Sequence, residues 1–319
     1  MTVRLYRSTD ASAPTLTGQV GSLVALLDAV LVNGYGSQTA AGWTKAYSGT
    51  NTASYRMDTS GNTGFYLDVN DNAPASATDA RMRGYEAMTA VSTGTGPFPT
   101  AAQSSFGIAC RKSATANSTA RPWYIVADGS CLYVFVDTGD ITGCAFAFAF
   151  GDFFSYKSGD PYRCAIIGRY LENSGASNYD MVPWINGGLT PLTATSNGHY
   201  VARNWTGVGG SIAFSKFTSL LAGQGTSLVT GSLTSYVPYP NSPDSALELA
   251  PLWLGHTSCV RGYMKGLWCP LHAQPLSHGD LFTGSGNMAG KSFIALNFRN
   301  DSASQGNGQI VVEYSDTWS

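Results

Sequence analysis

One run of the sequence, Cys144-Ala-Phe-Ala-Phe-Ala-Phe150, alternates small and aromatic residues without a break. Successive side chains of a β-strand point to opposite faces, so this run would place its phenylalanines on one face and its alanines on the other. A face of alanines lets a second layer approach closely. We therefore expect this strand at the centre of a fold built from layered sheets.

Other apolar runs have the length and the β-branched and aromatic content of strands. In chain order they are 64–67, 123–126, 132–136, 164–167, 200–202, 247–254, 260–267, 292–298 and 309–314. Charged residues make up 12% of the chain, against about 25% in an average soluble domain. Glutamate and lysine, which usually cover the exposed faces of helices, are sparse. The sequence therefore predicts a mainly β protein.

A single amphipathic helix is expected near the start, over about residues 18–32. Its apolar positions recur at the three-and-four spacing of one helix face. They are Leu23, Leu26, Leu27, Val30 and Leu31. Thr17 is the expected N-cap, and Asn33-Gly34 is the expected stop. The face should lie on a sheet or on a neighbouring subunit, which makes Leu23 and Leu27 candidate interface residues.

These elements predict an antiparallel β-sandwich or a barrel-like core with one N-terminal helix and long loops. The 319 residues exceed the ~250 at which single cores tend to split. Residues 1–319 therefore form one large β-rich region, or a domain of 1–180 with the helix and a second of 181–319. The polar segments 172–198 and 207–245 read as long loops, which in compact domains are usually functional.

The six cysteines stand singly, mostly inside apolar runs, and no CxxC pair occurs. They are Cys110, Cys131, Cys144, Cys164, Cys259 and Cys269. We expect small buried hydrophobes rather than a zinc or redox site, with a disulfide as the alternative. The net charge of −2 and the lack of Lys or Arg runs give no field for capturing a polyanion, so nucleic-acid binding is not expected.

The segment Asp68-Val-Asn-Asp-Asn-Ala-Pro74 is similar to the calcium-binding linker of cadherins. The clustered side-chain oxygens of Asp68, Asn70, Asp71 and Asn72 suit a hard cation. However, the chain has no adjoining repeats to complete a cadherin site, and Ala73 stands where an EF-hand loop has glycine. An Asx-rich turn between strands is the favoured interpretation, and loosely bound calcium is the alternative.

The segment 284–292 resembles a phosphate-binding loop, but Ser285 stands where GxxxxGK[ST] requires glycine. The residues that follow, 293–298, read as a strand rather than as the helix whose N-terminus holds phosphate. A β-hairpin turn is therefore expected here.

No motif predicts catalysis or a cofactor. The histidines His199, His256, His272 and His278 have no metal-ligand spacing. Gly255-His-Thr-Ser258 lacks the second glycine of a nucleophile elbow. We therefore expect no enzyme and no cofactor.

Seven tryptophans and 17 tyrosines could line a sugar-stacking surface. Trp123, Tyr133 and Trp253 lie in strand patterns and are expected in the core. In contrast, the aromatic residues of the loops are candidates to face a partner. These are Trp205, Tyr236 and Tyr239.

Seven stretches carry a resemblance to known proteins. They are Met1-Thr-Val-Arg-Leu-Tyr-Arg-Ser-Thr-Asp-Ala-Ser-Ala-Pro14, Gly18-Gln-Val-Gly-Ser-Leu-Val24, Asn33-Gly-Tyr-Gly36, Gly94-Thr-Gly-Pro-Phe-Pro-Thr100, Ala120-Arg-Pro-Trp123, Gly151-Asp-Phe-Phe-Ser-Tyr-Lys-Ser-Gly-Asp160 and Val260-Arg-Gly-Tyr-Met-Lys-Gly-Leu-Trp-Cys-Pro-Leu-His272. Through them the chain resembles virion structural proteins of tailed bacteriophages of Gram-negative hosts. The resemblance covers nearly the whole sequence.

The resemblance implies a particle component in a neck or collar, head-decoration or fibre-anchoring, or tail or baseplate position. Its partners would be copies of itself in a symmetric ring or array and other virion proteins. The N-terminus lacks a signal-peptide core and no apolar run reaches ~18 residues, so no membrane segment is expected. Synthesis and assembly would take place in the bacterial host cytoplasm. The alternatives are a module binding a host-surface glycan and, third, a polysaccharide or cell-wall hydrolase.

Overall fold

The computed structural model describes residues 2–74, 76–139, 145–168, 199–212, 214–217, 247–256, 259–270, 276–298 and 308–319. These residues form three antiparallel sheets, one short α-helix that continues as a π-helical segment, and one short 3-10 helix. The prediction of a mainly β, antiparallel fold is confirmed. Over the described ranges none of the sheets closes on itself, so the barrel-like alternative is wrong. No helix among these residues has the length and apolar content needed to span a bilayer.

Each sheet draws most of its strands from one part of the chain. The central sheet has the order β1 (Arg4–Arg7), β8 (Trp123–Ala127), β9 (Cys131–Val136), β10 (Ala145–Asp152), β12 (Cys164–Ile167), β13 (His199–Arg203) and β14 (Gly209–Ile212). The N-terminal sheet has the order β2 (Thr44–Gly49), β3 (Thr52–Arg56), β4 (Tyr66–Asn70), β5 (Asp79–Ala90) and β6 (Thr93–Phe98), with β7 (Ile108–Arg111) beside β5. The C-terminal sheet has the order β15 (Phe214–Phe217), β16 (Leu249–His256), β17 (Cys259–Pro270), β20 (Gly308–Glu313), β19 (Ser292–Phe298) and β18 (Leu281–Thr283), with β11 (Phe154–Ser155) beside β17.

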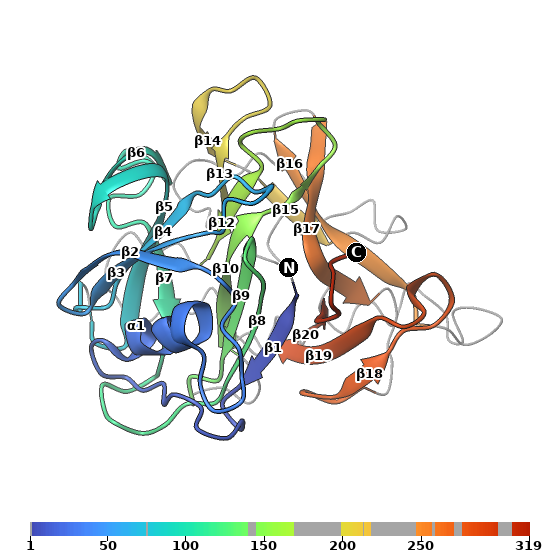
Figure 1. Ribbon diagram of the computed structural model, residues 1–319, viewed down its shortest axis with the longest axis horizontal. Helices are drawn as coiled ribbons and strands as arrows, with labels where there is room; N and C mark the ends of the chain where they lie inside the picture. Colours follow the sequence, from blue (N-terminus) through green and yellow to red (C-terminus); the bar gives the residue numbers. More distant parts are fainter. Residues whose placement is uncertain are drawn as a thin grey trace.

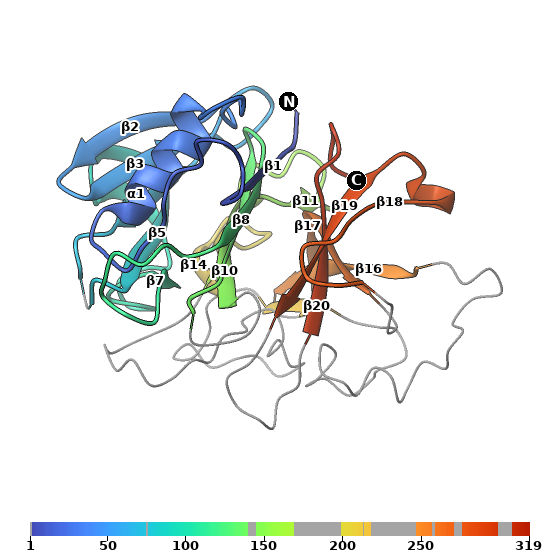
Figure 2. The ribbon, with the colours of Figure 1, turned by 90° about the horizontal axis from the view of Figure 1, so that it is seen from below.

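The central sheet lies between the other two (Figures 1 and 2). Strand β10 is its middle strand, as its alternating sequence predicts. Phe150 faces the N-terminal sheet, where its ring stacks on Phe98 with a centroid distance of 6.0 Å. On the other face Ala149 is the cross-strand partner of Tyr133, whose hydroxyl donates to the carbonyl of Lys265 in β17. The small alanine face thus lets the C-terminal sheet approach.

The alternation of β10 does not run unbroken. Its pairing with β9 shifts register between Ala145 and Phe148, which places an extra residue in β10. Such a bulge reverses the faces of the residues on its two sides. The expected common face therefore holds for Phe148 and Phe150, and the side chain of Phe146 is not among those that the structure describes.

Eight of the predicted strands correspond to observed ones: 123–126, 132–136, 164–167, 200–202, 247–254, 260–267, 292–298 and 309–314 match β8, β9, β12, β13, β16, β17, β19 and β20. The predicted strand at 64–67 overlaps β4 only at its last two residues. The sequence patterns do not predict β2, β3, β5 or β6, because these strands are rich in polar residues and glycine. Strands β14 and β15 lie within 207–245, which was expected to be a loop. The predicted loop at 172–198 lies outside the described residues.

The helix is shorter than predicted and begins later. α1 spans Ser22–Leu27, and a π-helical segment, η1, continues over Asp28–Asn33. Gly34 then adopts a φ of 76°, which ends the helix where Asn33-Gly34 predicted. The N-cap is Gly21 rather than Thr17, and the N–H of Leu23 donates to the Asp71 carboxylate at 2.8 Å. A side chain from 48 residues downstream thus replaces the local cap.

Leu23 and Leu27 were candidate interface residues, and this prediction is wrong. Both side chains are fully buried in a core cluster that includes residues of all three sheets. The helix lies on the inner face of the N-terminal sheet, where the Tyr55 hydroxyl donates to the carbonyl of Val24 at 3.1 Å. These leucines therefore pack inside the chain and offer no surface to a neighbour.

Replacing Leu27 by alanine is expected to lower the free energy of unfolding by about 2–5 kcal/mol, because a fully buried leucine leaves a cavity. Leu281 in β18 is 46% exposed and serves as the control. Leu281→Ala should change stability by about 0.5 kcal/mol or less. Urea unfolding of both variants measures the difference, and equal effects would contradict the core position of Leu27.

The predicted burial of the cysteines is confirmed for the three whose side chains the structure describes. Cys110, Cys131 and Cys164 are buried free thiols. Burial raises the pKa of Cys131 to about 12, so this thiol stays protonated and unreactive at neutral pH. Trp123 and Tyr133 are also buried as predicted, whereas Trp253 is only partly buried. The possible domain boundary at 180/181 lies outside the described residues and stays a prediction.

Candidate functional site

The four candidate calcium ligands do not converge on one point. Asp68 and Asn70 share the outer face of β4, where their cross-strand partners are Arg83 and Arg81 of β5. The Asp68 carboxylate accepts hydrogen bonds from Ser54 Oγ at 2.6 Å and from Ser92 Oγ at 2.9 Å. Its oxygens are therefore engaged by hydroxyl groups.

Asp71 is turned into the interior, away from Asp68. Its side chain is fully buried and forms an ion pair with Lys112, while its second oxygen caps α1 at Leu23. Asn72 lies at the surface, and its backbone N–H donates to Asn70 Oδ1 at 3.0 Å. This last contact is the Asx turn that the sequence favoured. Among the described residues no group of three His, Cys, Asp or Glu side chains is placed to hold a metal ion.

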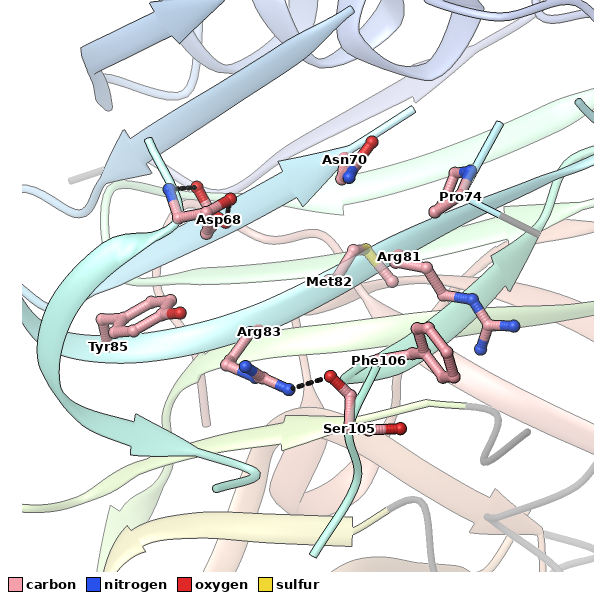
Figure 3. A pocket seen from close by; sticks show the side chains of 10 residues that line it. Asp68, Asn70, Pro74, Arg81, Met82, Arg83, Tyr85, Ser105 and Phe106 are labelled. Carbon is pink, nitrogen blue, oxygen red and sulfur yellow. Dashed lines mark hydrogen bonds between the residues drawn. The ribbon is translucent and has the colours of Figure 1, made fainter. Parts of the chain in front are cut away.

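Asp68 and Asn70 instead line a pocket of about 190 Å³ on the outer face of the N-terminal sheet. Figure 3 shows these two residues above β5, whose Arg81, Arg83 and Tyr85 cross the middle of the view. Ser105 and Phe106, from the loop that precedes β7, close the opposite side. Pro74, Met82 and Ser92 complete the lining.

The two arginines of the pocket are held differently. Arg83 donates through one terminal nitrogen to the carbonyls of Ser104 at 2.6 Å and Ser105 at 3.0 Å. Its Nε is buried and has no hydrogen-bond partner. Arg81 is 4% exposed, and its guanidinium lies 5.7 Å from the centre of the Phe106 ring. Burial lowers the pKa of Arg81, and the charge of Asp79 opposes that shift.

This arrangement suits a small acceptor-rich ligand. Guanidinium groups donate in a planar fork that matches carboxylates and phosphates, and the exposed ring of Phe106 adds an apolar wall. The sequence analysis did not identify Arg81, Arg83 or Phe106. The alternation Asp79-Ala-Arg-Met-Arg83 was the available signal, because a strand would place its charged residues on one face.

A second feature is an exposed surface made of β11, β17 and the turn that joins β13 to β14. We call it the aromatic surface, and its members are Phe154, Tyr156, Trp205, Val208, Val260 and Tyr263. All of these except the partly buried Tyr263 are 50–60% exposed. The rings of Phe154 and Tyr263 stack with centroids 5.2 Å apart. Of the predicted partner-facing aromatics, Trp205 therefore lies at the surface, whereas Tyr236 and Tyr239 lie outside the described residues.

Close backbone contacts hold the aromatic surface in place. Strand β11 lies so near β17 that a Cβ at Gly262 would meet the carbonyl oxygen of Phe154 at 1.9 Å, so only glycine fits. The Asn204 side chain accepts the N–H of Val208 at 2.9 Å and so fixes the turn that presents Trp205. Lys157 Nζ donates to the Trp205 carbonyl at 2.6 Å. This hydrogen bond joins the segment that follows β11 to the turn between β13 and β14.

A buried ion pair lies directly beneath this surface. Arg261 of β17 and Asp160 of the loop after β11 have side chains that are 2% and 1% exposed, with an N–O distance of 2.7 Å. Arg261 also donates to the carbonyl of Arg203 in β13. Burial alone would raise the pKa of Asp160, but hydrogen bonds from Arg261 and Ser155 hold it below its usual range. The pair thus joins the C-terminal sheet to the central sheet.

The segment that resembles a phosphate-binding loop forms a hairpin connection, as predicted. β18 and β19 pair on either side of it, and the short 3-10 helix Gly286–Met288 (η2) lies within it. His199 is buried in β13, and His278 packs edge-on against Tyr124 with ring centroids 5.2 Å apart. His256 has no described side chain, and His272 lies outside the described residues.

The sequence matches no protein-family model, and no curated protein is significantly similar to it.

Proposed function

We propose that this chain is a structural component of a tailed-bacteriophage particle and acts by packing on copies of itself and on other particle proteins. Its position would be in the neck or collar, in head decoration or fibre anchoring, or in the tail or baseplate. It would be synthesised and assembled in the cytoplasm of the bacterial host. The resemblance of its sequence to virion structural proteins suggests this role.

The aromatic surface is the observation that carries the proposal. Large apolar side chains that are at least half exposed and lie side by side are uncommon on proteins that work alone, and they mark interaction surfaces. Val208 and Val260 favour a protein partner over a saccharide, because aliphatic side chains offer a sugar neither stacking nor hydrogen bonds. The low content of charged residues agrees with a surface that neighbours cover.

A hydrolase has less support from the same residues. Glycoside hydrolysis needs two carboxyl groups that face each other across a cleft. Asp68 is the one carboxylate that lines the described pocket, and hydroxyl groups of Ser54 and Ser92 already engage it.

Replacing two large side chains of the aromatic surface is expected to weaken assembly of the chain into particles. The double variant Tyr156→Ser, Val260→Ser should be lost from particles or reduced about tenfold in occupancy, since the buried area of two large side chains contributes several kcal/mol to an interface. Leu281→Ser, which removes a similarly exposed residue from β18, is the matched control and should assemble normally. Quantitative mass spectrometry of purified particles measures the incorporation of each variant.

A reconstruction of the intact particle provides the direct test. We expect ordered copies of the chain with the aromatic surface covered, and an obligate contact of this kind buries ~2,000 Å² or more. A chain that is absent from purified particles, or present with this surface facing solvent, contradicts the proposal.

A further inference from the structure

The aromatic surface has a composition that suits one class of protein segment. Phe154 and Tyr263 stack with ring centroids 5.2 Å apart, and the ring of Tyr156 lies 6.1 Å from that of Tyr263 at an angle of 56°. Trp205 is joined to these rings through the hydrogen bond from Lys157 Nζ to its carbonyl. Closely spaced, exposed rings are the surfaces on which proline-rich segments dock in the polyproline II conformation.

The polar ends of the same side chains suit the backbone of such a segment. Polyproline II has no internal hydrogen bonds, so its carbonyl groups need donors when a surface takes them out of water. The indole N–H of Trp205 and the hydroxyl of Tyr156 belong to side chains that are 51% and 59% exposed, and both groups can donate. Val260, 50% exposed, adds an apolar contact for a proline ring.

The chain carries a segment of this class in its own sequence. Outside the described residues it reads Tyr236-Val-Pro-Tyr-Pro-Asn-Ser-Pro-Asp244, with three prolines in nine residues. Pro240 and Pro243 have the PxxP spacing of proline-rich ligands. In polyproline II every third side chain returns to the same face, ~9 Å further along. These two prolines would therefore contact two neighbouring rings of one surface.

The charges of the aromatic surface and of this segment are complementary. The Lys157 side chain is exposed, and its Nζ donates to a neutral group, the carbonyl of Trp205. That contact leaves the positive charge of Lys157 uncompensated. Asp244 follows directly after Pro243 in the segment. An ion pair between Asp244 and Lys157 would fix the direction in which the segment lies, since charges across an interface set its register.

We propose that the aromatic surface of one copy binds residues 236–244 of a second copy. The large side chains of this surface are at least half exposed within the single chain, so another molecule has to cover them. A contact between two different parts of the same chain is heterologous, and its repetition closes into a ring or continues as a filament. This inference rests on the proposed function, because it names the contact through which copies pack.

Titration calorimetry of the full chain with a synthetic peptide of residues 234–245 tests the binding. We expect a Kd of about 0.1 mM, because proline orders the free peptide in advance and so reduces the entropy lost on binding. The same peptide with Pro240→Ala and Pro243→Ala should bind at least about tenfold more weakly. Trp205→Ser in the full chain should cause a similar loss, whereas Leu281→Ser, the exposed control in β18, should bind as the unaltered chain does.

A charge exchange tests the direction of the segment and does not depend on the folding of Trp205→Ser. Lys157→Glu places two negative charges opposite each other and should weaken binding of the peptide about fivefold or more. A peptide with Asp244→Lys should bind Lys157→Glu more tightly than the unaltered peptide does. A purely structural effect of Lys157→Glu would weaken the binding of both peptides equally, which would contradict the ion pair.

Mixing two variants of the full chain distinguishes this contact from a symmetric one. Sedimentation velocity should show that Trp205→Ser alone, and the chain with Pro240→Ala and Pro243→Ala alone, each lose self-association. Their equimolar mixture should form dimers, because one intact aromatic surface then meets one intact segment. A symmetric contact between two aromatic surfaces would leave this mixture monomeric.

Three results would each overturn the inference. These are no binding of the peptide, equal binding of its alanine version, and a mixture that stays monomeric. The failure of the proposed function is a separate observation, because it is measured on particles. A chain that enters particles with its aromatic surface covered would keep the proposed function even where the peptide does not bind.

Discussion

Replacement of Arg261 by methionine is expected to lower the free energy of unfolding by about 3–5 kcal/mol, the usual cost of removing one partner of a buried ion pair. The Arg261 guanidinium contacts both oxygens of Asp160 at 2.7–2.9 Å and donates to the carbonyl of Arg203. Methionine keeps much of the apolar stem but leaves the Asp160 carboxylate buried without its cation. Urea unfolding followed by tryptophan fluorescence measures the loss.

The matched control is the exposed ion pair of Arg7 and Asp10, where Arg7 is 42% exposed. Arg7→Met should cost about 1 kcal/mol or less, because solvent screens such pairs. Similar losses for Arg261→Met and Arg7→Met would show that the Arg261 pair is not buried in solution.

The Arg261–Asp160 pair also predicts how the free energy of unfolding changes at acid pH. The pKa of Asp160 is lower in the folded chain than its ordinary value of about 3.9. The ionised Asp160 carboxylate therefore makes its full contribution to the free energy of unfolding above its ordinary pKa. This contribution is lost as the pH falls through the lower pKa of the folded chain. Asp160→Asn removes this titration, so its stability should fall less steeply than that of the unaltered chain below about pH 4.

Replacement of Lys112 by methionine is expected to lower the free energy of unfolding by a similar amount, about 3–5 kcal/mol. Lys112 and Asp71 have fully buried side chains. Lys112 Nζ also donates to the carbonyl of Gln19 at 2.6 Å, and Asp71 caps α1 at Leu23. Without Lys112 the carboxylate that starts the helix would be an unpaired buried charge, so urea denaturation should shift to lower concentration together with loss of helical circular dichroism.

Lys45 of β2 provides the control, because its partner Asp28 lies in η1, which continues α1. It pairs with Asp28 at 2.8 Å, with side chains 28% and 25% exposed, and Lys45→Met should cost about 1 kcal/mol or less. The double variant Lys112→Met, Asp71→Asn removes both charges and should lose less stability than the two single losses added together. Additive losses would show that Lys112 and Asp71 do not interact.

The strands with strong local signals could be predicted from the sequence, and those of the N-terminal sheet could not. β9 and β12 consist of consecutive apolar residues that are buried on both faces of the central sheet, and in β8 only Tyr124 is partly exposed. β5 contains Asp79, Arg81 and Arg83, which the usual strand pattern of apolar and β-branched residues does not include. These charged residues occur in a strand because tertiary contacts, such as the Arg83 bonds to residues 104 and 105, satisfy them.

The candidate pocket illustrates the same limit. The sequence identified Asp68 and Asn70 by their oxygens but grouped them with Asp71 and Asn72 as possible cation ligands. Alternation along a strand separates Asp71 from Asp68, and the fold brings Lys112 to Asp71 from 41 residues away. The arginines that face Asp68 and Asn70 come from a different strand, β5, whose register no local pattern specifies.

The sequence by itself determined the strand character of the chain, the central place of β10 and the end of the helix at Gly34. These features follow from alternation, residue size and backbone freedom, which act between near neighbours. Only the tertiary structure decided that Leu23 and Leu27 are core rather than interface, that Asp71 caps the helix, and which side chains share the pocket and the aromatic surface. The physical reason is that burial, charge pairing and strand register depend on residues distant in sequence, and one residue of shift in register exchanges the two faces of a strand.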